Sequence, residues 1–179
     1  MLEDARVVLD GMRRSLDDLP RSLQREKAAD AHAGRILLWM WNNREVLPFS
    51  DIGQDFANAL TWFLVAEDLE EFVWEWLLLE AQAVKDQRRG NFEDYWSTRL
   101  RWCQHLLGGF TCAQAYWTND GVGSGTNAAI RTYLRAAEAF GPHSSFARTV
   151  SLVGSATVVD QLLKKQDVDP CDPVLLNRS

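Results

Sequence analysis

Apolar residues recur at helical spacing along most of the chain, and the clearest stretch is "DIGQDFANALTWFLVAED" over residues 51–68. Its apolar side chains fall at positions i, i+3, i+4, i+7 and i+8, which places them on one face of a helix. They are Phe56, Ala59, Leu60, Phe63 and Leu64. No stretch shows convincing alternation of apolar and polar residues, the pattern of a half-buried strand. The sequence therefore predicts an all-α protein.

Glycine, proline and charge mark where the helices end. The segment 69–89 begins with acidic residues and ends with basic residues before Gly90, so its charges complement the helix dipole at both ends. Adjacent glycines at 108 and 109 permit a bend within a longer helical segment. An irregular tail is expected over 166–179, where two prolines occur. We expect six or seven helices, over 2–19, 22–44, 51–68, 69–89, 92–117, 126–140 and 143–165.

The glycine-rich stretch "GVGSGT" over residues 121–126 raises the question of a phosphate-binding loop. Such a loop requires a strand before it, a helix after it and, in one common form, a lysine. Here the preceding "CAQAYW" is typical of a helix, the lysine is absent and the last glycine of GxGxxG is missing. The nearby asparagine, aspartate, serine and threonine are ordinary turn and helix-capping residues. We interpret the stretch as a turn between two helices.

A shift of 70 residues superposes two apolar patterns of similar size. Ala59, Leu60, Phe63, Leu64 and Ala66 fall on Ala129, Ile130, Tyr133, Leu134 and Ala136. Seventy residues correspond to two periods of about 35, and periods of about 34 or 35 are typical of helix-turn-helix repeats. The pattern predicts stacked antiparallel helix pairs in one helical domain over 1–165, an α-solenoid-like arrangement with its clearest unit at 51–89 and a second at 126–165. The alternative is an irregular helical bundle.

The stretch "NALTWFLVAEDLEEFVWEWLLLEA" resembles a unit of the pentatricopeptide repeat proteins, and "NAAIRTYLRAAEAF" resembles the first helix of another. The related tetratricopeptide pattern is matched less well, because no glycine follows Trp62 at the usual place. The resemblance covers about two units. One residue is missing between Asn58 and "LEE", and aligning the two asparagines requires a shift of 69.

This resemblance implies RNA binding in organellar gene expression. Asn58 and Asn127 match the family's base-reading position, and Arg131 and Arg135 share a helix face that could meet the RNA backbone. The net charge of −6 and the pI of about 5.1 disfavour a surface built to neutralise phosphates. RNA binding is therefore the alternative to a protein partner.

Cysteine usage and the first residues indicate the compartment. Three irregularly spaced cysteines do not form a disulfide framework, which favours a reducing environment. The first 20 residues lack a secretory apolar run and are too acidic for an organellar transit peptide. The longest apolar run is interrupted by Glu75 and Glu80 and cannot span a bilayer. We expect an intracellular location, with the cytoplasm favoured and mitochondria as the alternative.

Eight tryptophans are unusual for 179 residues. Trp74 and Trp76 are two apart, about 200° around a helix, so they cannot face the same neighbour, and the same holds for Trp39 and Trp41. One tryptophan of each pair packs against a second neighbour or is exposed to a partner. These four are the candidate partner-binding residues.

No motif indicates catalysis, a metal or a cofactor. Cys103 and His105 are two apart on a predicted helix and point to different sides, so they do not form a thiol–base pair. HExxH, CxxC and GxSxG are absent. We therefore expect a non-enzymatic module for protein–protein interaction or scaffolding, with no catalytic, metal or cofactor residues. A helical enzyme of unidentified activity is the further alternative, and the oligomeric state is open.

Overall fold

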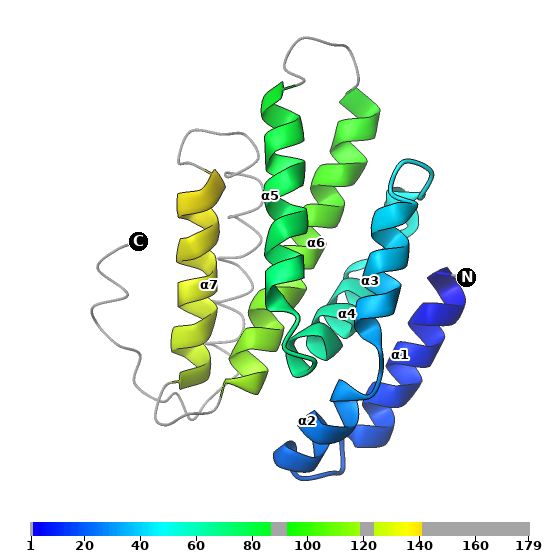
Figure 1. Cartoon of the computed structure of the whole chain (residues 1–179), viewed down its shortest axis with the longest axis vertical. Helices are drawn as coiled ribbons and strands as arrows, with labels where there is room; N and C mark the ends of the chain where they lie inside the picture. The colour runs from blue at the N-terminus through cyan, green and yellow to red at the C-terminus, as the bar shows by residue number, and fades with distance from the viewer. Residues whose placement is uncertain (1, 87–92, 119–123, 141–179) are drawn as a thin grey trace.

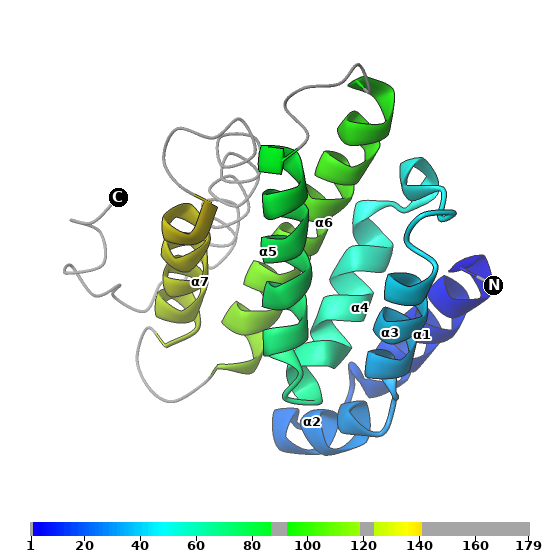
Figure 2. The same cartoon turned by 45° about the horizontal axis from the view of Figure 1, so that its top comes forward.

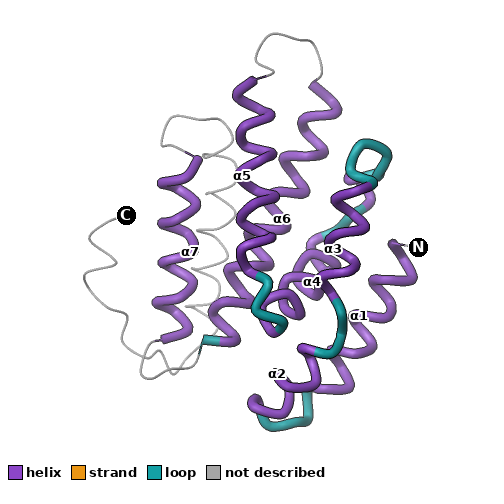
Figure 3. Tube along the Cα trace, viewed as in Figure 1, coloured by secondary structure: helices purple, strands orange, loops and turns teal. Residues whose placement is uncertain are grey.

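The computed structural model describes residues 2–86, 93–118 and 124–140, and it confirms the all-α class (Figures 1 and 3). Within these ranges there are seven α-helices, one 3-10 turn and no strand. They are α1 (Leu2–Leu16), α2 (Arg21–Ala29), α3 (Ala33–Asn42), η1 (Phe49–Asp51), α4 (Gln54–Ala66), α5 (Glu70–Asp86), α6 (Glu93–Trp117) and α7 (Ser124–Phe140). The predicted helix over 143–165, the tail over 166–179 and the glycines at 121 and 123 lie outside the described residues.

The single helix predicted over 22–44 is wrong, because the chain forms two helices there. The break lies between α2 and α3, where His32 adopts a left-handed conformation with φ of 55°. A distant side chain stabilises the new helix start: Glu67 Oε1 accepts a hydrogen bond from the Ala33 backbone N–H at 2.5 Å, and Glu67 Oε2 accepts one from Gly34 at 3.0 Å. The carboxylate thus satisfies two backbone donors at the positive end of α3.

Replacing Glu67 with alanine is expected to lower the free energy of unfolding by about 1 kcal/mol, and by up to about 2 kcal/mol, because two backbone donors of α3 lose their acceptor. Chemical denaturation of the variant and the parent chain measures this. Glu26→Ala on the exposed face of α2 is the matched control and is expected to change stability by less than about 0.5 kcal/mol. Equal effects of the two substitutions would contradict the capping role.

The adjacent glycines at 108 and 109 do not interrupt α6, which runs from Glu93 to Trp117. Gly109 instead permits the close approach of α4. A Cβ atom at Gly109 would lie 2.7 Å from Thr61 Oγ1 and 2.9 Å from the Ala57 carbonyl oxygen. The glycine therefore serves the packing between two helices and does not break either one.

Helix α4 is the centre of the structure. Every residue from Ala59 to Ala66 is buried, and α1, α2, α3 and α6 surround the helix (Figures 1 and 2). Its most extensive contact is with α6, which lies two helices later in the chain, whereas it meets α5 over only a short stretch. Helix α5 packs on α6 and α7.

This packing differs from a stack of consecutive helix pairs. The region 51–89, predicted as the clearest repeat unit, contains α4 and α5, and these two helices pack mainly on α6. The two apolar patterns related by a shift of 70 also have different surroundings: Leu64 in α4 is fully buried, whereas Leu134 in α7 is partly exposed. The described helices form a bundle around α4 and α6. None of them is both long and apolar enough to cross a membrane.

Candidate functional site

Trp74 and Trp76 both lie inside the protein, with exposed fractions of 3% and 2%. Trp74 packs edge-on against Phe110 at a ring distance of 5.4 Å. Trp76 packs on the other side of α5, with its ring centroid 5.2 Å from that of Trp41 and 5.9 Å from that of Trp102. Two tryptophans on different sides of one helix are thus both buried, because α5 has neighbours on both sides. Neither side chain protrudes from the surface, although Trp76 lines the groove between α3 and α5.

Trp39 and Trp41 of α3 are half-buried, and Trp41 lines an open apolar groove between α3 and α5. The groove has a volume of about 430 Å³. Leu38 and Phe72 stand on opposite walls with 59% and 56% of their surface exposed. Its apolar lining includes Leu37, Leu38 and Trp41 from α3, and Leu69, Phe72 and Trp76 from α5 and the turn before it.

The groove exists because its two walls, α3 and α5, pack on different helices of the protein. Helix α3 packs on α4, whereas α5 packs mainly on α6, so the space between α3 and α5 is not filled by either. Leu38 and Trp41 are three apart and share one face of α3, and Phe72 and Trp76 are four apart on α5. Buried Leu37 and Trp76 form the floor.

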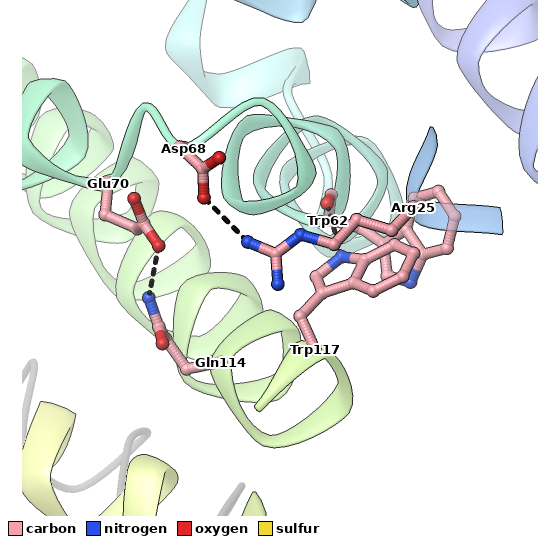
Figure 4. A network of polar contacts seen from close by, with 6 residues as sticks. All are labelled: Arg25, Trp62, Asp68, Glu70, Gln114 and Trp117. Carbon is pink, nitrogen blue, oxygen red and sulfur yellow. Dashed lines mark hydrogen bonds and ion pairs between the residues drawn. The ribbon is translucent and has the colours of Figure 1, made fainter. Parts of the chain in front are cut away.

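Polar contacts fix the turn between α4 and α5, which carries Leu69 at the groove (Figure 4). Asp68, in a left-handed conformation, accepts a 2.6 Å hydrogen bond from Arg25 of α2. Glu70 accepts a hydrogen bond from Gln114 of α6 at 3.5 Å. The turn also lies close to α3: a Cβ atom on Gly34 of α3 would lie 2.5 Å from Leu69 Cδ1. The wall that carries Leu69 is therefore held by contacts to α2, α3 and α6.

A buried ion pair between Arg99 and Glu80 lies near Trp76, in the floor of the groove. Arg99 Nη2 lies 3.3 Å from Glu80 Oε1 and 3.5 Å from Glu45 Oε1, and the side chains of Arg99 and Glu80 are only 9% and 5% exposed. Burial raises the pKa of Glu80, and the Arg99 guanidinium opposes that rise. Phe49 lies between this pair and the tryptophans, 5.9 Å from the Arg99 guanidinium carbon and 6.3 Å from the Trp76 ring. The pair supports the floor of the groove.

Cys103 and His105 have separate surroundings. Cys103 is fully buried, and burial together with the nearby Glu80 charge raises the pKa of its thiol well above the ordinary value, which suppresses the nucleophilic thiolate. His105 Nδ1 instead lies 2.6 Å from Gln54 Oε1 of α4, and burial and Arg101 lower the pKa of the imidazole. Among the described residues, no group of three His, Cys, Asp or Glu side chains could hold a metal ion.

The residues assigned to RNA reading are divided between two helices. Asn58 lies on α4, whereas Asn127, Arg131 and Arg135 lie on α7, and α6 separates these helices (Figure 2). Arg135 already has two partners: its Nη2 is 3.0 Å from Glu71 Oε2, and its guanidinium carbon is 4.4 Å from the Trp74 ring centroid. The structure does not bring the four side chains to one surface.

The groove was not predicted from the sequence. Leu38 and Phe72 have the same helical spacing as residues of a core, and only the tertiary packing shows that their face is uncovered. The one available signal was apolar residues on more than one face of the same helix, as in "ILLWMW" of α3. Comparisons of the chain with protein-family models, curated proteins and solved structures found no match.

Proposed function

We propose that this protein is an interaction module that binds an amphipathic helix of a partner protein in the groove between α3 and α5. The observation that carries the proposal is the exposure of Leu38 and Phe72 on facing apolar walls. Exposed apolar surface of this kind costs free energy in water, and a helix that lays its apolar side chains into a groove removes that cost. The groove volume falls within the range of about 300–1,000 Å³ that accommodates bound side chains or ligands.

Charge on the two walls favours one type of helix. Arg35 stands on the α3 wall and Glu75 on the α5 wall, and neither forms an ion pair with any described residue. A bound helix with an acidic flank toward α3 and a basic flank toward α5 would complement both charges. Complementary charges set the orientation and speed association more than they raise affinity. The net charge of −6 favours partners that are basic overall.

A displayed library of amphipathic helical peptides tests the proposal. The apolar residues repeat at i, i+3 or i+4, and i+7, and one half of the library has the acidic and basic flanks exchanged. We expect selection to enrich the complementary orientation. Leu38→Glu and Phe72→Glu should each weaken the selected peptides by about 10- to 100-fold, because burying such a side chain contributes about 1.5–3 kcal/mol. Fluorescence anisotropy measures the dissociation constants.

Val46→Glu provides the matched control, since Val46 is 79% exposed and lies outside the groove. It should leave peptide affinity unchanged. Equal weakening by Val46→Glu would show binding without a defined site, and failure to select any helix would contradict the proposal. Sedimentation equilibrium identifies the other occupant: a dimer that Leu38→Glu converts to a monomer would assign the groove to a second copy of this chain.

A further inference from the structure

A second, smaller cavity lies on a different part of the surface, where α1, α2, α4 and α6 meet. Its volume is about 190 Å³, and polar and apolar atoms contribute to its lining in similar measure. Arg13 of α1, Arg21 of α2 and Asn58 of α4 line it, together with Trp62, Cys112 and Tyr116. None of its lining residues is acidic.

The two arginines differ from the paired arginines of this protein. Arg25, Arg99 and Arg135 each form an ion pair with a carboxylate. Arg13 and Arg21 form none with the residues that the structure describes. Each instead lies over an aromatic ring: the guanidinium carbon of Arg13 is 5.8 Å from the Trp62 centroid, and that of Arg21 is 4.6 Å from the Tyr116 centroid. Other described arginines, such as Arg35, also lack a carboxylate partner, but Arg13 and Arg21 are the two that line this cavity, where an anionic ligand would supply the partner that both lack.

Asn58 adds a third donor. Its Oδ1 accepts a 2.8 Å hydrogen bond from Gln54 Nε2, which leaves the Nδ2 hydrogens of Asn58 to serve as donors at the cavity. The Tyr116 hydroxyl is engaged with Gln24 Oε1, so it is not counted among the available donors. Arg13, Arg21 and Asn58 thus offer two guanidinium groups and one amide, and all three can donate hydrogen bonds to a ligand.

We infer that this cavity binds a small oxyanion, a carboxylate or phosphate, between Arg13 and Arg21, with Asn58 donating a further hydrogen bond. Guanidinium groups match the planar oxygen pairs of both anions. The volume is below the range of about 300–1,000 Å³ typical of drug-sized ligands, which favours a free ion or a short-chain acid. This site is independent of the groove between α3 and α5.

Isothermal titration calorimetry tests the inference. One series uses inorganic phosphate and another uses acetate, so the experiment distinguishes phosphate binding from carboxylate binding. We expect saturable binding of at least one anion with a stoichiometry of one. Arg13→Gln and Arg21→Gln should each weaken it by roughly tenfold or more, because a hydrogen bond to a charged group is lost. Arg14→Gln, an exposed neighbour on α1 that does not line the cavity, should have no effect. Absence of saturable binding, or equal weakening by Arg14→Gln, would overturn the inference.

Cys112 supplies a second measurement, because it lines the cavity and is partly exposed while Cys103 is fully buried. In a Cys171→Ser background, the Cys112 thiolate displaces iodide from iodoacetate, a small carboxylate, or from neutral iodoacetamide. We expect a preference for iodoacetate that phosphate suppresses and that the Arg13→Gln, Arg21→Gln double variant loses. Circular dichroism verifies that the variant is folded, and the single glutamine variants replace the double variant if it does not fold. Arg13→Lys and Arg21→Lys keep the charge and should retain the preference for iodoacetate. An unchanged reagent preference in the folded glutamine variants would contradict the site.

Discussion

Replacing Arg99 with leucine is expected to lower the free energy of unfolding by about 3–5 kcal/mol near neutral pH. The Arg99 and Glu80 side chains are 9% and 5% exposed, so the substitution leaves a buried carboxylate without its main counterion. The Trp76 side chain also lowers the pKa of Glu80 by hydrogen bonding, but it carries no charge and does not replace the guanidinium. Urea denaturation of the variant and the parent chain measures the change.

The loss should depend on pH in a defined direction. Burial raises the pKa of Glu80 above its ordinary value of 4.5 and Arg99 opposes this rise, so removing Arg99 raises the pKa further. A carboxyl group with a raised pKa in the folded state contributes stability below its unfolded pKa, and this contribution is lost as the pH rises through the folded pKa. The cost of Arg99→Leu should therefore be smaller near about pH 4, where Glu80 is protonated in the variant, than near about pH 7.

Two comparisons separate this explanation from a loss of packing. The double variant Glu80→Leu, Arg99→Leu should recover much of the lost stability, because it removes both charges. Arg6→Leu removes one partner of a partly exposed pair, Arg6 and Asp10, and should cost no more than about 1 kcal/mol. The same cost of Arg99→Leu at both pH values, with no recovery in the double variant, would assign the effect to packing alone.

The helices themselves follow from local patterns in the sequence. Apolar spacing and end charges predict α4, α5 and α7 within a few residues, because these signals lie inside each helix. The division of the predicted helix over 22–44 does not follow from local patterns. It depends on Glu67, which reaches the backbone of Ala33 and Gly34 from the end of α4. A single sequence contains no local signal of such a distant cap.

The two candidate sites depend on tertiary packing even more strongly. Leu38 and Phe72 become a groove only because α3 and α5 pack on different helices. The sequence drew attention to Asn58 for a different reason, and it gave no indication that Arg13 and Arg21 would meet it from two other helices. Trp74 and Trp76 contact different neighbours, as their spacing of two residues on a helix predicts. Helical spacing alone does not predict that both tryptophan side chains are buried, because it does not show which helices cover each face of α5.

Gly109 shows how a glycine that permits a bend can instead serve the packing of two helices. Glycine is a poor helix former, and substituting alanine in a helix interior gains roughly 0.5–1 kcal/mol when nothing else changes. Gly11 in α1 meets that condition, because no atom lies within 4 Å of where its Cβ would be. Gly11→Ala should therefore raise the free energy of unfolding by about that amount.

Gly109→Ala is expected to have the opposite sign and to lower the free energy of unfolding by about 2 kcal/mol, the middle of the range for overpacking a core. Its Cβ would lie 2.9 Å from the Ala57 carbonyl oxygen, and a backbone atom cannot rotate away as a side chain can. Helices α4 and α6 would have to separate along their most extensive contact. Thermal and urea denaturation of both alanine variants measures whether each substitution raises or lowers the free energy of unfolding. A stabilising Gly109→Ala would show that α4 and α6 do not require this close approach.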